Sequence, residues 1–301
     1  MALQDDLRMK WRTGGMVVRL ILVNIAVFLG LWLTYAVLLL PFGGRTAALG
    51  AIGEHVLPWV AMPASLKALL WKPWTVVTAI FGHVEPMHLF WNMVLLWFGG
   101  RMFQDLLGDK RLLGTYLLSG FVGSLLWIIG VHAYGRLGSA TTLLGASGAV
   151  IGVLVCIATY RPHMLVNLIF IGPVKIMYVA AAFVFLDLIG VGSDGQVAHE
   201  AHIGGALYGF LAAQQLKRGN DWSLTFVQFL EKLSPFRKRR SSRLRVEKSF
   251  VRNSRSDVDY NASKRDKQAR VDSILDKISR SGYDSLSKEE KDFLFKASDG
   301  K

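Results

Sequence analysis

Long apolar runs are the feature that most limits what this chain can fold into. They dominate from about Val17 to Leu216, and 52% of the 301 residues are hydrophobic. A run of about 20 apolar residues is long enough to cross the hydrocarbon core of a bilayer as a helix. The residues after Leu216 are much more polar. We therefore expect an all-α, polytopic membrane protein with a polar C-terminal tail.

The apolar runs predict six membrane-spanning helices in one domain over 17–216, after a short N-terminal segment at 1–16. The predicted spans lie at about 17–40, 86–106, 111–133, 147–160, 172–192 and 199–216. The connection at 41–85 is too long for a simple link between helices, and loops of this length are often functional. The first run is too long for a cleavable signal peptide and lacks a small-residue cleavage site, which indicates a retained first span.

Basic residues predict the orientation of the chain. The formal net charge is +13, and part of the excess lies in the tail segment "FRKRRSSRLRVEK". Beside a membrane domain, such a cluster marks the cytoplasmic side and meets anionic lipid, so we expect membrane lipids and no nucleic acid as partners. Lys and Arg also precede the first span and follow the second, fourth and sixth. The expectation is an integral protein of a bacterial cell (inner) membrane with both termini cytoplasmic.

The tail divides into two segments. Residues 217–268 predict a basic, disordered linker, and 269–301 a small helical segment. Val271 and Ile274 have helical spacing, Gly282 ends that helix, and Ser287 with Glu290 forms a capping box for the next one. Two interpretations stay open for this segment, a docking site for a cytoplasmic partner or a weakly folded appendage.

Polar residues inside the predicted spans gather at one depth. Ionisable groups are costly in a membrane and are candidates for function by default. The second, fourth and sixth spans carry them at their first residues, and with this orientation all three spans start at the same membrane face. The residues are His83, His88, Asn92, Ser147, His199, Glu200 and His202.

Glycine spacing brings two of these spans together. Gly148 and Gly152 share a face of the fourth span, and His202 shares a face of the sixth with Gly205 and Gly209. Small residues four apart let membrane helices pack backbone to backbone. The two spans can then place the hydroxyl of Ser147 beside the imidazole of His202.

A serine hydroxyl becomes an effective nucleophile when a base takes its proton, and a neutral imidazole suits that role near pH 7. Ser147 stands at a helix N-terminus, where free N–H groups favour a developing oxyanion. The side chains of His88 and Asn92 can add further donors. The residues thus point to serine hydrolase chemistry.

The same motifs resemble those of the rhomboid intramembrane serine proteases. Residues 145–148, "GASG", resemble their G-x-S-G motif, and "AHIGGALYG" at 201–209 resembles their sixth-helix motif. "HVEPMHLFWN" resembles their second-helix pattern, and "WKPWTVVTAIFGH" resembles a stretch of their first loop. The resemblance covers about 17–216 and implies a six-helix bundle that cleaves transmembrane segments near the outer leaflet without metal or cofactor.

Carried over residue by residue, the resemblance implies a Ser–His dyad. Ser147 matches the nucleophile and His202 the general base, while His88 and Asn92 match the oxyanion donors. His83 matches the first histidine of the second-helix pattern, and with Gly145 and Gly148 it completes the set of supporting residues. One departure is Gln104, which stands where the family usually carries glutamate and puts a contact of the first loop in doubt.

Several of these residues also have a purely structural interpretation. His199 competes with His202 for the role of the base, but it fits an interfacial residue better. Asp187 in the fifth span is a candidate third member of a triad, but a local structural role is preferred because the family motif asks for a dyad. Three other functions stay open. They are a metal site built from His83, His88, His199, Glu200 and His202, a non-catalytic relative that binds membrane clients, and a transporter. "HEAH" lacks the histidine pair of a metalloprotease helix, and no repeat between the halves supports a transporter.

Overall fold

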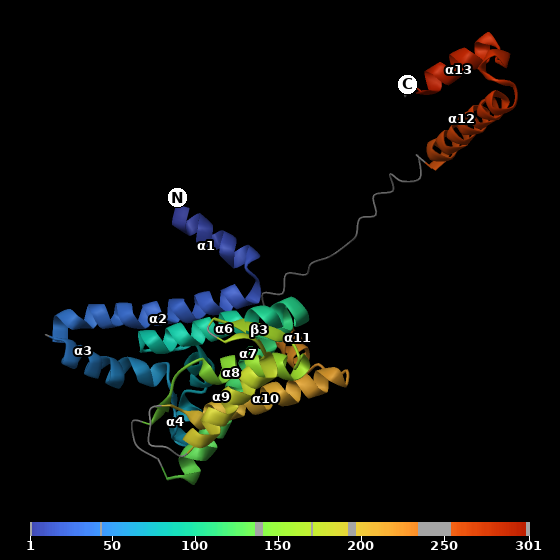
Figure 1. The fold of residues 1–301 in the computed structure, drawn as a ribbon. Helices are drawn as coiled ribbons and strands as arrows, with labels where there is room; N and C mark the ends of the chain where they lie inside the picture. The colour runs from blue at the N-terminus through green and yellow to red at the C-terminus, as the bar shows by residue number, and fades with distance from the viewer. Residues whose placement is uncertain are drawn as a thin grey trace. The chain divides into compact units, whose positions relative to one another are not determined.

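The structure is a computed structural model and describes residues 2–42, 44–135, 141–169, 171–191, 197–233 and 254–298 (Figure 1). The chain divides into two compact units, 1–237 and 238–301, and each is described by itself below. The first unit is mainly helical. The second unit holds the last two α-helices.

Each predicted span coincides with a helix of the first unit. These helices are α2 (Gly15–Phe42), α6 (Pro86–Leu107), α7 (Asp109–Ala133), α8 (Ser147–Tyr160), α9 (Ile176–Gly190) and α10 (His199–Lys217). The fifth starts later than predicted because Gly172–Lys175 form a strand. Within the described residues, Gly15–Leu39 and Asp109–Ala133 are long and apolar enough to cross a membrane, while α8 and α9 are shorter apolar helices. The fold is that of an all-α membrane protein, and the count of six spans stays a prediction.

Short elements fill the ends and the long connection. They are α1 (Ala2–Thr13), α3 (Arg45–Ala51), a π-helix η1 (Ile52–Val56), 3₁₀-helices η2 (Leu57–Trp59) and η3 (Ala79–Phe81), α4 (Leu66–Trp71) and α5 (Thr75–Thr78). Two antiparallel pairs complete the unit, β1 (Met62–Pro63) with β2 (Thr142–Leu143) and β3 (Leu165–Leu168) with β4 (Gly172–Lys175). The connection at 41–85 is thus structured. Its strand β1 holds β2, which precedes α8.

Helix α10 packs backbone to backbone against α8 and α7. A Cβ added at Gly205 would strike the carbonyl oxygen of Gly148, and one at Gly209 would strike that of Gly152. On the other side, a Cβ at Gly123 of α7 would come within 2.5 Å of the carbonyl oxygen of Ala201. The predicted close approach of the fourth and sixth spans is confirmed. Small residues make it geometrically feasible.

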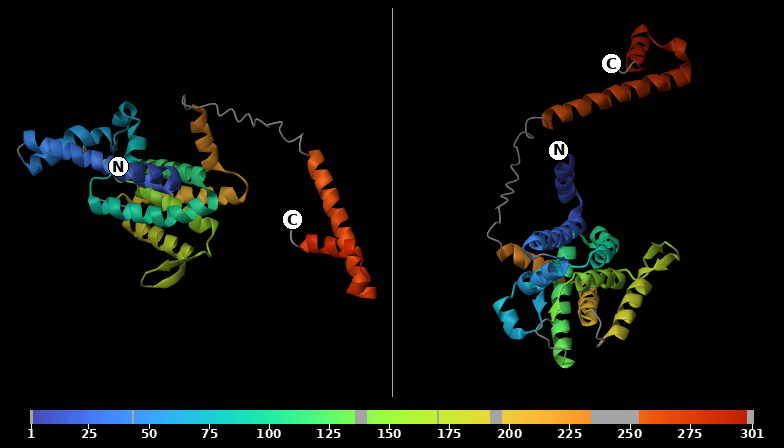
Figure 2. Two further views of the ribbon diagram at one scale, coloured as in Figure 1. Left: turned by 90° about the horizontal axis from the view of Figure 1, so that it is seen from above. Right: turned by 90° about the vertical axis from the view of Figure 1, so that its left-hand side faces the viewer.

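Helix α9 is less enclosed than its neighbours. Figure 2 shows α9 and the β3–β4 hairpin at one side of the bundle. Within α9 the buried residues are Ile176, Ala180 and Asp187. Apolar side chains such as Phe185 and Leu186 are exposed, as expected for a helix that faces lipid.

Gln104 contacts the start of α2. Its side-chain Oε1 accepts a hydrogen bond from the backbone N–H of Val17 at 2.8 Å. The first N–H groups of a helix have no partner inside the helix, so this amide satisfies one of them. Gly15, at φ +70°, lies against the same side chain, where a Cβ has no room. The structural contact of Gln104 is thus with α2, whereas the resemblance suggested the first loop.

The prediction of a disordered linker from residue 217 is wrong for 222–233, which form helix α11 (Trp222–Leu233). Ser223 and Val227, four residues apart, are buried. The Ser223 hydroxyl contacts Thr115 Oγ1 at 2.9 Å and Tyr208 OH at 3.1 Å, and Asp221 pairs with Arg111 at 2.6 Å. Tertiary packing thus orders α11 in a stretch that looked like polar tail. Residues 234–253 of the predicted linker lie outside the described residues.

The second unit contains α12 (Ser254–Ser281), the 3₁₀-helix η4 (Tyr283–Ser285) and α13 (Lys288–Ser298). Gly282 ends α12 at φ +76°. Glu290 N donates to Ser287 Oγ at 3.2 Å, and Ser287 N donates to Glu290 Oε2 at 2.8 Å. This reciprocal pair confirms the predicted capping box. Helix α12 begins well before the predicted start at 269, and a docking role for this unit stays a prediction.

Candidate active site

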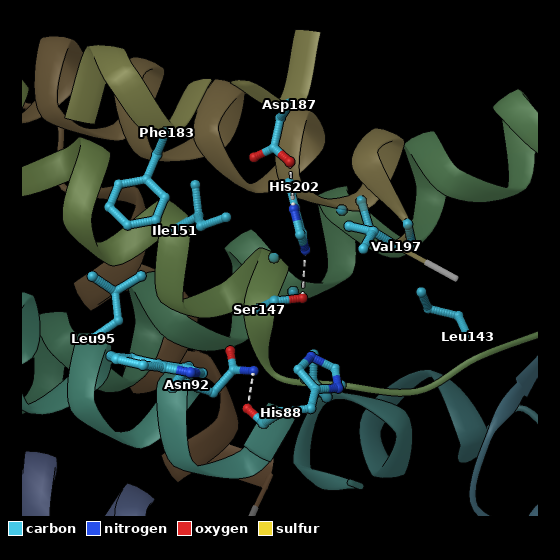
Figure 3. Close-up of a pocket in the computed structure, with 18 of the residues that line it drawn as sticks. His88, Asn92, Leu95, Leu143, Ser147, Ile151, Phe183, Asp187, Val197 and His202 are labelled. Carbon is cyan, nitrogen blue, oxygen red and sulfur yellow. Dashed lines mark hydrogen bonds and ion pairs between the residues drawn. The ribbon is translucent and has the colours of Figure 1, made fainter. Parts of the chain in front are cut away.

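A large cavity lies where α6, α8 and α10 begin. Its volume is about 1410 Å³. The walls come mainly from these three helices, from α7 and α9, and from the segments 141–145 and 167–169. They include Ser147, His202, His88 and Asn92 (Figure 3). Most of the other lining residues are apolar. The cavity is therefore a mainly apolar chamber with a few polar groups at the helix starts.

Ser147 and His202 are in hydrogen-bond contact. The His202 Nε2 atom lies 2.7 Å from the Ser147 Oγ atom. Ser147 is the first residue of α8, and His202 lies in the first turn of α10. The close packing of the glycines along α8 and α10 carries both side chains into the cavity. The arrangement can move a proton from the hydroxyl to the imidazole.

The segment before Ser147 is held from several sides. Gly145 has φ +147°, a region that favours glycine, and a Cβ there would lie 2.9 Å from His88 Cε1. Its N–H donates to the Ala79 carbonyl at 2.9 Å, and the N–H of Ala146 donates to His83 Nε2 at 3.4 Å. His83 is fully buried behind this segment. Gly145 and His83 thus support the position of the nucleophile.

Gly148 makes room for the partner helix. A Cβ at this position would lie 2.8 Å from the carbonyl oxygen of Ala201. The residue therefore supports the site through the contact of α8 with α10, one residue after Ser147.

His88 and Asn92 line the cavity from α6. Figure 3 shows them on the side of Ser147 away from His202. The Asn92 Nδ2 atom donates to the His88 carbonyl at 2.8 Å. A side-chain amide carries two N–H donors, so a second one can serve a group in the cavity. The structure thus brings the four residues with predicted chemical roles to one chamber.

Asp187 also belongs to this site, although the sequence analysis preferred a local structural role for it over a place in a triad. Its Oδ1 atom lies 2.7 Å from His202 Nδ1 and 2.8 Å from His199 Nδ1. The expectations of a local structural role for Asp187 and an interfacial place for His199 do not describe this geometry. The available signal was the charge itself, since Asp187 is the one charged residue in the run that became α9.

The five residues weighed as a metal site do not come together. Within the described residues, the grouping with metal-ligand spacing is Asp187, His199 and His202, whose ligand atoms lie within 4.8 Å of one another. Two ligands of a tetrahedral zinc stand roughly 3.3 Å apart. The contacts of 2.7 and 2.8 Å are closer and have hydrogen-bond spacing. The donor set as it stands fits a hydrogen-bonded cluster better than a metal centre.

Comparisons with known proteins agree with this fold. Residues 70–218 match the rhomboid domain, and 256–299 match a family of unknown function (DUF6576). The chain belongs to the rhomboid family. Membership supports a protease-like function in the membrane.

The similar proteins include three from distant organisms. Presenilin-associated rhomboid-like protein A, mitochondrial, of Danio rerio is 32% identical over 136 residues, 44% of this chain and 35% of the relative. Rhomboid protein 1, mitochondrial, of Saccharomyces cerevisiae is 33% identical over 146 residues, 46% of this chain and 40% of the relative. RHOMBOID-like protein 12, mitochondrial, of Arabidopsis thaliana is 28% identical over 157 residues, which are 48% of this chain and 47% of the relative. The chain spans less than half the length of these relatives.

The names of these relatives correct the predicted location. A bacterial cell membrane with cytoplasmic termini was expected, and this is wrong on the comparison, because the relatives are named as mitochondrial proteins. The count of basic residues on alternate loops carries no information on which organelle holds the membrane.

Proposed function

We propose that this chain is an intramembrane serine endopeptidase that cleaves transmembrane segments of membrane proteins. Ser147 is the nucleophile and His202 the general base. The observation that carries the proposal is the 2.7 Å contact between Ser147 Oγ and His202 Nε2 inside a cavity of about 1410 Å³. The two residues come from different helices, so the contact depends on the packing of the whole bundle.

The first step forms an acyl-enzyme. Ser147 Oγ attacks the carbonyl carbon of the scissile bond while His202 Nε2 takes the hydroxyl proton. The tetrahedral intermediate then collapses, the carbon–nitrogen bond breaks, and His202 gives the proton to the leaving nitrogen. In the second step His202 takes a proton from water, whose oxygen attacks the acyl carbon. The bond between that carbon and Ser147 Oγ then breaks, and His202 returns the proton to Ser147 Oγ as the carboxylic acid product leaves.

The oxyanion that forms in each step needs donors. The start of α8 offers backbone N–H groups beside Ser147, with the positive end of the helix dipole. We assign His88 and Asn92 as the side-chain donors, because both line the cavity beside the nucleophile. Donors held in place before reaction stabilise a developing charge without reorganisation.

The walls of the cavity suggest the substrate class. The lining residues of α6 and α9 are mainly apolar and include Trp91, Phe98, Phe183 and Leu186. A transmembrane segment presents apolar side chains to such walls. In a helix its carbonyls are engaged in backbone hydrogen bonds, so the segment has to unwind locally before Ser147 can attack. We propose cleavage close to the membrane surface at which α6, α8 and α10 begin.

The experiment is cleavage of a single-span reporter by the purified chain in detergent, with Ser147→Ala and His202→Ala beside wild type. Either variant should lose turnover, by up to about a millionfold on the scale known for serine proteases. Wild type should cut equally with and without chelator. Residual cutting by Ser147→Ala would contradict the proposal. A wild type that binds several reporters and cuts none would favour the alternative, a non-catalytic membrane client-binding protein.

A further inference from the structure

We propose that Asp187 is a positioning residue of this site, whose carboxylate holds His202 with Nε2 toward Ser147 and is itself held by His199. The inference rests on the proposed function, since it assigns a role for that reaction. It changes the dyad that the family resemblance implies into a chain of three groups. Figure 3 shows Asp187, His202 and Ser147 in line, with a dashed contact on each side of the imidazole.

The two contacts of His202 decide where its proton sits. Asp187 Oδ1 lies against the Nδ1 atoms of both His199 and His202, at 2.8 and 2.7 Å. An oxygen that meets two ring nitrogens in this way is an acceptor, so each Nδ1 carries a proton. The neutral ring of His202 then has its lone pair on Nε2, which faces Ser147 Oγ. This is the tautomer that can accept the hydroxyl proton.

Asp187 also offers a countercharge during the reaction. When His202 takes the proton it becomes an imidazolium, and the carboxylate lies 2.7 Å away. The side chains of Asp187 and His202 are 10% and 13% exposed. A charge pair shielded from water interacts more strongly than one at the surface. The same carboxylate thus selects the tautomer and stabilises the charged form of the base.

His199 secures the carboxylate. Its Nδ1 reaches the same oxygen of Asp187, and its ring lies against Gly190, where an added Cβ would overlap the imidazole. His199 therefore touches α9 at two places from the start of α10. It acts on the base through Asp187. A second donor on one oxygen leaves the carboxylate less freedom to rotate away from His202.

The neighbours of Asp187 on α9 indicate that its carboxylate has a specific role. The neighbours Leu186, Leu188 and Ile189 are exposed apolar side chains, whereas Asp187 is buried. A carboxylate at such a place in a membrane is costly unless it is paired. Because α9 has few buried residues of its own, the Asp187 contacts also fix the distance between α9 and the base.

The test measures kcat and KM separately with the full chain in lipid vesicles and a transmembrane reporter. Asp187→Asn keeps the size of the side chain and removes the charge, and Asp187→Glu restores the charge. Asp105→Asn is the matched control, since Asp105 is an exposed partner of Arg101 on α6. We expect Asp187→Asn to lower kcat on the order of 10²- to 10⁴-fold with little change in KM. Asp187→Glu should recover part of the loss, and Asp105→Asn should match wild type.

Several outcomes separate this inference from the proposed function. A wild-type kcat for Asp187→Asn, while Ser147→Ala is inactive, overturns the role of Asp187 and leaves the proposed function intact. A loss confined to KM and thermal stability also overturns it, because a structural role would produce that result. Cleavage by Ser147→Ala contradicts the proposed function itself.

The wild-type chain gives an independent measurement if Asp187→Asn does not fold. Nitrogen-15 NMR of histidine-labelled protein, with His202→Ala to identify the signal, reports which ring nitrogen carries the proton. The expected result is a proton on Nδ1 of His202. A proton on Nε2 in the resting chain overturns the inference.

Discussion

Gly205 lies so close to Gly148 that a Cβ on Gly205 would strike the Gly148 carbonyl oxygen. Gly148 follows Ser147 directly, and Gly205 is one turn beyond His202. The separation of the two helix backbones at this point therefore sets the separation of hydroxyl and imidazole. This one approach ties the packing of the bundle to the chemistry of the site.

Enlarging Gly205 should cost both stability and activity. Gly205→Val forces α8 and α10 apart, and overpacking of this kind destabilises by about 1–3 kcal/mol. Thermal unfolding in detergent and reporter cleavage measure the two effects. Gly30→Ala on α2 is the control, because a Cβ there meets nothing within 4 Å. Equal melting of Gly205→Val and wild type would show that the helices can separate without cost.

Gly145→Ala should impair catalysis through the position of Ser147. The residue has φ +147°, and a Cβ would press on the His88 ring at 2.9 Å. Displacement of reacting groups by about 1 Å can cost roughly a hundredfold in rate. Reporter kcat measures the effect. Gly50→Ala, in open space, serves as the comparison, and an unchanged kcat in Gly145→Ala would mean that the segment adapts.

Gln104 should contribute to stability as an acceptor at the start of α2. Gln104→Leu removes the oxygen that accepts from Val17 N, and the expected loss is about 1 kcal/mol. Gln104→Glu keeps an oxygen there and adds a negative charge near a helix N-terminus, which is favourable. The two variants should therefore differ in melting temperature, with glutamate at least as stable as glutamine. Equal melting temperatures of Gln104→Leu and Gln104→Glu would contradict a role for Gln104 as an acceptor at the start of α2.

The second unit should lose stability in acid. The Lys277 ammonium, at 2.9 Å, lowers the pKa of the Glu290 carboxyl below its usual value, with help from the backbone N–H of Ser287. A lowered pKa in the folded state means that the contribution is present above the ordinary pKa of glutamate. It is lost as pH falls through the folded value.

Amide exchange of α13 in the full chain, corrected for the intrinsic rate at each pH, should show this loss as reduced protection. Lys277→Met should weaken the pH dependence, whereas Glu289→Gln should leave it in place. Because Glu290 is exposed, we expect a small effect. Protection that is independent of pH in wild type would contradict the assignment.

The sequence by itself determined the helical class, the approximate positions of the apolar helices and most of the residues that line the site. Apolar runs set the helices, and their ends fell near the predicted ones because caps and glycines act locally, as at Gly282 and Ser287. Motif spacing identified Ser147, His202, His88 and Asn92 as candidate site residues. The glycine spacing of α8 and α10 predicted that these two helices pack closely, because only small residues allow such a contact.

Only the tertiary structure decided which distant groups meet. Asp187 faces both histidines because of how α9 is rotated and placed against α10, and that depends on packing across many residues. Helix α11 was missed for the same reason, since its order comes from contacts of Ser223 with Thr115 and Tyr208. Local propensity encodes a helix, whereas the partner of a side chain depends on the relative placement of helices, which no short stretch of sequence specifies.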